Sequence, residues 1–210
     1  MNTLKSIQYD RINTGPVQKR AFVMIHGWKG NKNSFKSVSN LIGLDNTAWF
    51  FPEAPYNFEE DCSKKTWAVE KSPGVWEVDE PRRMLKEFLV DHILSEFDSK
   101  DVFVMGFSQG AAVCYEYIMG VEKQFGGIFP IGGFFFKYSK KAKRVSEDNK
   151  NTPIIIGHGT KDDIIPIEKS EEAFNQLSKE GANVDIYKYN GGHKISMNFL
   201  RRIIEVINGK

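Results

Sequence analysis

Cysteine is scarce in this chain: its 210 residues include only two, Cys62 and Cys114, which stand far apart. Two isolated cysteines supply neither a disulfide framework nor the clustered thiols of a zinc site. The sequence also lacks any apolar run long enough to cross a bilayer, and polar residues interrupt the apolar ones across residues 1–10, so a signal-peptide core is missing. We therefore expect a reduced, cytoplasmic protein without stable membrane insertion.

An excess of charge of either sign is absent as well. Lys and Arg number 29 against 27 Asp and Glu, and the formal net charge of +2 gives no general reason to expect a nucleic-acid partner. The length suits one domain, residues 1–210, and a hydrophobic share of 40% suits a buried core. We expect either a monomer or a homodimer. Phenylalanine, by contrast, is plentiful, with 16 residues.

Short apolar runs alternate with helical patterns along nearly the whole chain. Runs such as residues 22–25 and 154–156 are continuous rather than alternating, as in strands that are covered on both faces. The expected strands are residues 21–26, 48–51, 101–107, 127–131, 153–157 and 184–189, and the expected helices are residues 79–97, one around 173–177 and one over 199–207. This alternation predicts an α/β fold with a mostly parallel central sheet, helices on both faces and at most a minimal cap.

Two segments fit neither pattern. Residues 52–74 are rich in proline and charge and carry Trp67, so we expect a surface excursion near the upper edge of the sheet. The second segment, residues 137–150, concentrates basic side chains, namely Lys137, Lys140, Lys141, Lys143 and Arg144. A solvated loop is the favoured interpretation of such a charge run. The alternative is a small cap that meets an anionic group of the substrate.

One short motif lies where a strand gives way to a helix. In Gly106-Phe107-Ser108-Gln109-Gly110 the serine follows a buried strand and precedes the small residues of a helix. A nucleophile elbow needs this context, because a tight turn points the serine hydroxyl outward and leaves no room for side chains at the two glycines. The turn also aims the Gln109 N–H and the start of the helix at a developing oxyanion. The sequence therefore predicts Ser108 as a nucleophile and Gln109 as an oxyanion donor.

A nucleophilic serine needs a general base, and four histidines are available. His92 lies on the charged side of its helix, and His26 and His158 each end a strand before a glycine, where they more naturally organise loops. In this fold the acid follows the serine and the histidine comes last. His193, which follows Gly191-Gly192 after the last strand, is the remaining candidate for the base.

The acid of the triad should leave the end of the strand at residues 153–157, one crossover before the histidine. Asp162 and Asp163 stand side by side there. Either carboxylate could orient the histidine Nδ1–H while the other faces solvent. The residues alone leave this choice open.

Four motifs together make the resemblance to a known family specific. In order, they are His26-Gly27, the Gly106–Gly110 elbow, His158-Gly159-Thr160-Lys161-Asp162 with Ile165-Pro166, and Gly191-Gly192-His193. From about Ala21 to the C-terminus, the chain resembles the phospholipase/carboxylesterase family of α/β-hydrolases, which includes the acyl-protein thioesterases. The resemblance implies hydrolysis of short- to medium-chain acyl esters or thioesters without a metal or a cofactor. It also implies that Asp162 is the acid and that Trp28 donates the second oxyanion N–H.

The chain departs from the family pattern near the acyl site. The family has a small or aliphatic residue followed by Gly-Asp after its His-Gly pair, whereas this chain has Trp28-Lys29-Gly30-Asn31. We expect Trp28 to narrow the acyl site against long chains, with Trp67, Phe134 and Phe135 as candidate pocket residues; core packing is the alternative for the two phenylalanines. Hydrolysis of another bond, in a lactone, peptide or lysophospholipid, stays open, as does a pseudo-hydrolase that only binds.

Overall fold

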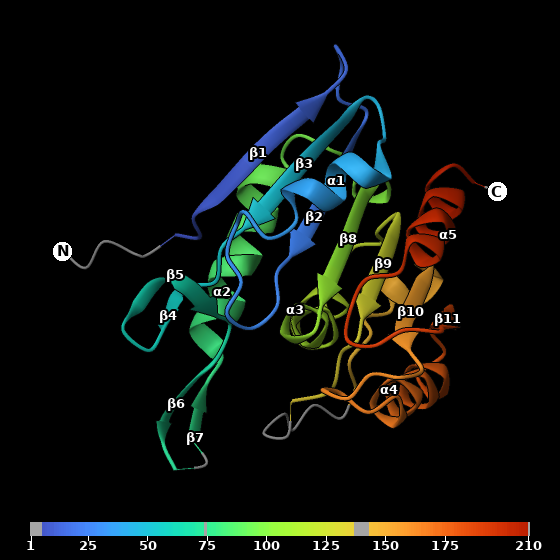
Figure 1. The fold of residues 1–210 in the computed structure, drawn as a ribbon. Coiled ribbons are helices and arrows are strands. Elements are labelled where there is room, and N and C mark those ends of the chain that lie inside the picture. The colour runs from blue at the N-terminus through green and yellow to red at the C-terminus, as the bar shows by residue number, and fades with distance from the viewer. Residues whose placement is uncertain (1–5, 74, 137–142, 210) are drawn as a thin grey trace.

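A seven-stranded sheet runs through the centre of the computed structural model, which describes residues 6–73, 75–136 and 143–209 (Figure 1). Its strands lie in the order β1 (Tyr9–Thr14), β3 (Thr47–Pro52), β2 (Arg20–Ile25), β8 (Val102–Phe107), β9 (Gly127–Ile131), β10 (Ile154–Gly159) and β11 (Val184–Tyr189). Strand β1 pairs with β3 in the antiparallel sense, and every other pairing in this sheet is parallel. The central strands are the continuous apolar runs of the sequence, and they are buried on both faces.

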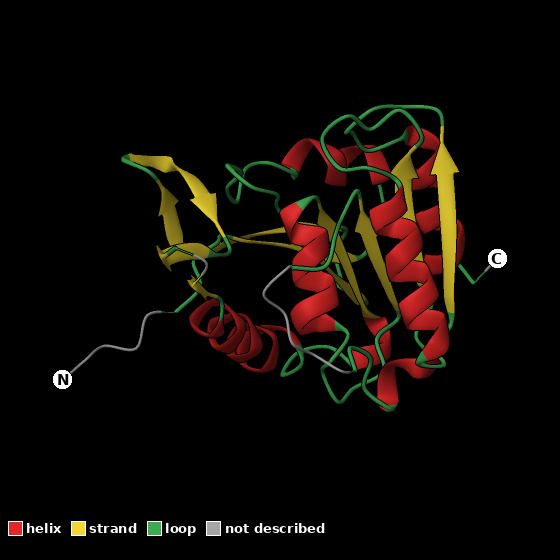
Figure 2. Cartoon of the chain, turned by 90° about the horizontal axis from the view of Figure 1, so that it is seen from below, coloured by secondary structure: helices red, strands yellow, loops and turns green. Residues whose placement is uncertain are grey.

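Helices cover the two faces of this sheet (Figure 2). One face carries α2 (Asp79–Phe88), continued by a π-helical turn, η1 (Leu89–Ile93), together with α3 (Gln109–Val113), continued by η3 (Cys114–Ile118), and α4 (Glu168–Lys179). The other face carries α1 (Lys36–Ile42) and α5 (Met197–Ile207). Two short 3₁₀ turns complete the helices, η2 (Ser99–Asp101) and η4 (Asp148–Asn151). Two apolar clusters result, one on each side of the sheet, and they confirm the predicted α/β fold with helices on both faces.

The segment between β3 and α2 differs from the irregular excursion that the sequence suggested. It forms two antiparallel hairpins, β4 (Tyr56–Phe58) with β5 (Asp61–Thr66), and β6 (Val69–Ser72) with β7 (Val75–Glu77). The second hairpin projects from the body of the molecule (Figure 1). The first hairpin is attached to the loop after β2, because Lys65 of β5 pairs with Gly30 in an isolated bridge. Its end returns to the core, where Thr66, Trp67 and Ala68 are buried.

The basic segment is only partly a solvated loop. Lys137, Lys140 and Lys141 lie outside the described residues. Lys143 is exposed and forms an ion pair with Glu147. Arg144, in contrast, is 7% exposed, pairs with the buried Glu116 and lies over the ring of Phe135. The prediction of a solvated loop is therefore wrong for Arg144, because a buried carboxylate draws its guanidinium into the interior.

Across residues 6–73, 75–136 and 143–209, no helix is both long enough and apolar enough to cross a membrane.

Candidate active site

Ser108 stands at the tight turn between β8 and α3. Its backbone has φ 56° and ψ −116°, a conformation that residues other than glycine rarely adopt. Its N–H donates to the carbonyl of Ile131 at 2.8 Å. A Cβ at Gly106 would lie 2.2 Å from the Gly110 carbonyl oxygen, and a Cβ at Gly110 would lie 2.1 Å from that of Ile25. Both glycines are therefore required by close backbone approach, as an elbow demands.

The loop after β11 brings His193 toward this elbow. Its ring lies 4.7 Å, centroid to centroid, from the ring of Phe107, the residue before the serine. Its Nδ1 lies 2.7 Å from Oδ2 of Asp162. Gly132, at φ 56°, leaves the space beside the imidazole open, since a Cβ there would lie 3.4 Å from the histidine Cε1. This loop thus carries the imidazole back across the sheet from the edge strand to β8.

Asp162 is buried at the end of β10, with a side chain only 1% exposed. Burial by itself raises the pKa of Asp162, but hydrogen bonds from the Ile165 N–H, from His193 and from the Ile164 N–H outweigh it, so the net pKa is lowered. The carboxylate is therefore held in its charged form. Asp163 is exposed instead. The structure thus brings Asp162, rather than Asp163, to His193.

His158 lies behind this carboxylate and is fully buried. Its Nε2 lies 2.9 Å from the carbonyl oxygen of Ile165 and 3.4 Å from Oδ2 of Asp162. Because only a protonated nitrogen can donate to a carbonyl, Nε2 carries the hydrogen, and Nδ1 accepts from the Ser170 hydroxyl at 2.6 Å. Through these contacts His158 holds the loop that carries Asp162 in place.

The segment after β2 forms the opposite side of the site. A Cβ at Gly27 would lie 3.2 Å from Cβ of Ser108, so this loop passes directly against the serine. Among the described residues, neither the Trp28 N–H nor the Gln109 N–H has a hydrogen-bond acceptor. Lys29 donates its N–H to the Lys65 carbonyl at 3.0 Å, which ties the loop to β5. Both predicted oxyanion donors thus have free N–H groups on segments beside Ser108.

Trp67 connects these two donor segments. Its indole N–H donates to the carbonyl of His26 at 2.9 Å, and its backbone N–H donates to Oε1 of Gln109 at 3.1 Å. The Gln109 amide also donates to the hydroxyl of Thr66 at 2.9 Å. Trp67 is 0% exposed, so the prediction that it lines the substrate pocket is contradicted: its indole supports the loops from inside the core.

His26 fixes the start of the same loop. Its Nδ1–H donates to the Gly27 carbonyl at 2.8 Å, and its Nε2 accepts from the Ala54 N–H at 3.0 Å. Burial lowers the pKa of His26 to about 4. The neutral ring is therefore a structural part of the loop at neutral pH, and the residue is not available as a base.

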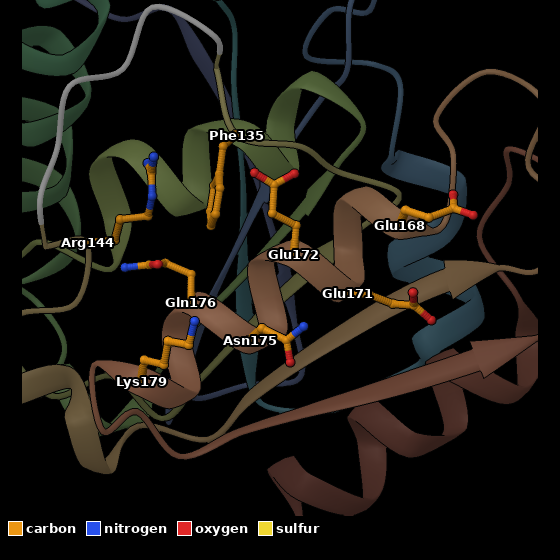
Figure 3. A pocket seen from close by; sticks show the side chains of 8 residues that line it. All are labelled: Phe135, Arg144, Glu168, Glu171, Glu172, Asn175, Gln176 and Lys179. Atoms are coloured by element: carbon orange, nitrogen blue, oxygen red, sulfur yellow. The ribbon is translucent and has the colours of Figure 1, made fainter.

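The candidate pocket phenylalanines lie in two different places. Phe135 packs edge-on against Tyr115 at 5.2 Å between ring centroids, and it lines a polar groove along α4 with residues such as Glu172 and Gln176 (Figure 3). The residues that line this groove include neither Ser108 nor His193, so the surface that Phe135 lines is not the acyl pocket that the sequence suggested. Phe134 is half-buried and packs edge-on against Phe136 at 5.7 Å.

In residues 6–73, 75–136 and 143–209, no group of three or more His, Cys, Asp and Glu side chains could hold a metal ion. The carboxylate and imidazole of the site contact each other instead.

Comparison with known proteins places the chain in a family. Residues 11–209 match the model of the phospholipase/carboxylesterase family. Carboxylesterase SOBER1 of Arabidopsis thaliana is 27% identical over 172 residues, which cover 76% of this chain and 75% of that protein. Acyl-protein thioesterase 1 of Emericella nidulans is 34% identical over 116 residues, 50% of this chain and 48% of that protein.

Among solved structures, the crystal structure of esterase PE8 superposes with a TM-score of 0.84 and 18% sequence identity, covering 98% of this chain and 99% of that one. At this identity the likeness concerns the fold alone. Because the family model spans nearly the whole sequence, the chain belongs to the phospholipase/carboxylesterase family of α/β-hydrolases.

Proposed function

We propose that this protein is a serine carboxylesterase that hydrolyses short- to medium-chain acyl esters through an acyl-enzyme on Ser108. The 2.7 Å contact between His193 and the buried Asp162, beside a serine held in a strained elbow, is the observation that carries the proposal. A serine hydroxyl is a weak nucleophile at neutral pH and needs an adjacent base that is held in the right orientation.

In the proposed mechanism, His193 takes the proton of Ser108 while the serine oxygen attacks the ester carbonyl. The N–H groups of Gln109 and Trp28 stabilise the oxyanion that forms. His193 then protonates the departing alcohol, and a water molecule repeats the same steps on the acyl-enzyme to release the acid.

Asp162 keeps the imidazole in one tautomer and stabilises its protonated form. The lowered pKa of Asp162 supports this role, because the carboxylate stays charged over the pH range in which an unprotonated imidazole can act as a base. The carboxylate therefore does not need to change its protonation state during turnover.

The preference for short acyl chains rests on Trp28. Its indole is 54% exposed and packs edge-on against Phe58 at 5.0 Å between ring centroids, on the loop that passes against Ser108. A bulky ring at this position limits the length of an acyl chain that can lie along the loop. Phe135 no longer contributes to this inference, because it lines the groove along α4.

Thioesters are the second candidate substrates, supported by the likeness to acyl-protein thioesterase 1 of Emericella nidulans. The proposed site has no feature that distinguishes the two bonds, since attack by serine on either carbonyl passes through the same oxyanion.

The function is tested with Ser108→Ala and with p-nitrophenyl esters and matched thioesters of graded acyl length. We expect the variant to lose at least about a thousandfold in kcat and all labelling by a fluorophosphonate, with a melting temperature close to that of the wild type. Wild-type kcat/KM should fall beyond medium chains. Full labelling of the alanine variant would refute the assignment of the nucleophile, and a preference for palmitoyl substrates would refute the acyl-length proposal.

A further inference from the structure

Lys29 occupies an unusual position beside the proposed oxyanion hole. It directly follows Trp28, and its Nζ lies 4.3 Å from the centroid of the Trp28 ring and 4.5 Å from that of Phe58. These two rings meet edge to face, so they form an aromatic cradle for the ammonium group. The backbone of Lys29 is anchored as well, with φ 63° and its N–H bound to the Lys65 carbonyl. The charge is therefore held at a defined place on the loop that carries the proposed oxyanion donor Trp28.

The neighbouring lysines form ion pairs with carboxylates, whereas Lys29 does not. Lys32 and Lys36 both pair with Asp10, Lys64 pairs with Asp61, and Lys65 lies 3.8 Å from Glu53. Within the described part of the chain, no carboxylate lies within 4.0 Å of the Lys29 ammonium. Its charge is thus available to a ligand that approaches the elbow.

Two more lysines flank the site on the opposite side. Lys161 directly precedes Asp162, and Lys194 directly follows His193. Both are exposed, and neither has an ion-pair partner among the described carboxylates. Their loops are joined, since the Lys161 N–H donates to the Gly191 carbonyl at 2.9 Å. Asp163 is exposed in the same loop and offsets part of this positive charge.

We propose that Lys29 is an anion-binding residue at the mouth of the site, and that the preferred ester carries a carboxylate or a phosphate near the scissile bond. This inference rests on the proposed esterase function. An ammonium group fixed on the loop of an oxyanion donor attracts an anionic ester and favours an orientation in which its carbonyl meets Ser108. The anionic group can belong to the acyl part or to the leaving group, and the choice of substrates separates these two sources.

The experiment compares charged esters with neutral partners of the same size. On the acyl side, the p-nitrophenyl monoester of adipic acid is paired with the same ester in which the free carboxylate is replaced by a carboxamide. On the leaving-group side, the butyrate ester of a nitrophenol with a ring carboxylate is paired with that of the matching carboxamide. The measured quantity is the ratio of kcat/KM for the charged ester to that for its neutral partner.

In the wild type at low ionic strength, this ratio should exceed one for at least one of the two pairs. Lys29→Met keeps the aliphatic stem on the rings and should lower the ratio about fivefold, as expected for one partly exposed ion pair. Lys29→Glu should bring the ratio below one, and 0.5 M salt should erase the preference of the wild type. Lys32→Met is the matched control: it removes a lysine already paired with Asp10 and should leave the ratio unchanged.

An equal ratio in the wild type and in Lys29→Met, for both pairs, would overturn the proposal. A preference that survives Lys29→Met but disappears in a Lys161→Met, Lys194→Met double variant would overturn the assignment to Lys29. Failure of the esterase proposal looks different, because hydrolysis of the neutral esters would then be absent or would persist in Ser108→Ala.

Discussion

Two buried histidines, His26 and His158, hold the two sides of the site in different ways. Each stands at the end of a parallel strand before a glycine, and both are at most 1% exposed. His158 contacts groups of its own neighbourhood, namely Asp162, Ile165 and Ser170. His26 instead accepts a hydrogen bond from Ala54, and its carbonyl accepts one from Trp67, 41 residues along the chain.

This difference shows that the two sides differ in the range of their contacts. The acid side is built from short loops that follow β10 and β11, so its geometry follows from local sequence and from one strand pairing. The oxyanion side is assembled from residues of three distant segments, and it depends on the hairpin β4–β5 and on Trp67. Substitutions on the two sides should therefore change kcat by different amounts.

The largest effect should come from the acid side. Asp162→Asn preserves the shape of the side chain but removes the charge that stabilises the imidazolium, and we expect kcat to fall by at least roughly a hundredfold. Asp163→Asn is the matched control, since this side chain is exposed, and it should cost less than about tenfold. The kcat of both variants on one ester measures this. A larger loss at position 163 would mean that the geometry of the acid loop is misassigned.

A smaller effect is expected on the oxyanion side. Trp67→Phe retains the packing ring but removes the indole N–H bonded to His26. Loosening a donor segment should cost less than removing a donor, so we expect kcat to fall about tenfold with KM nearly unchanged.

Trp49→Phe provides the control for this substitution. Trp49 is also buried and donates its indole N–H, to the Thr14 hydroxyl at 3.3 Å, but it lies in the other apolar cluster. It should lower the free energy of unfolding without a comparable loss of kcat. Equal kcat losses in the two variants would show that Trp67 acts only through global stability.

The last effect concerns stability rather than catalysis, and we expect it to leave kcat at neutral pH unchanged. Burial lowers the pKa of His26 from 6.5 to about 4. Between these two pH values the ring is protonated in the unfolded chain and neutral in the folded chain. The neutral ring contributes roughly 3 kcal/mol to the free energy of unfolding. This contribution is fully present above pH 6.5 and is lost as the pH falls from 6.5 to about 4. Urea unfolding at several pH values measures it. His26→Gln should flatten this part of the profile, and an unchanged profile would contradict the assignment.

The same difference in contact range explains what the sequence could predict. Continuous apolar runs identify the central strands, and the predicted bounds of β9 and β11 agree with the structure. Strand β1 was missed because its residues are half-buried and polar, without a continuous apolar run. Helix α1 was missed because it spans seven residues and has no capping side chain.

Within the site, local motifs place Ser108 and His193, and the structure brings Asp162 to the histidine. Trp67 was misplaced because nothing in its local sequence reveals a hydrogen bond to a residue 41 positions earlier. Charged residues lie two to four positions away on either side, so the segment has the composition of a surface loop while its tryptophan belongs to the core. Phe135 was misplaced for a similar reason, because its partners Tyr115 and Arg144 come from other elements.

The position of His193 after the last strand has a consequence for the order of events during synthesis. A nascent chain that has emerged through Asp162, in the loop after β10, contains the proposed nucleophile, the oxyanion segments and the proposed acid, but not the proposed base. His193 follows β11, which pairs with β10. Helix α5 must then pack on the sheet, because a Cβ at Gly157 would lie only 2.7 Å from the ring of Phe199. In the proposed mechanism, hydrolysis therefore begins only after the C-terminal part of the chain is in place.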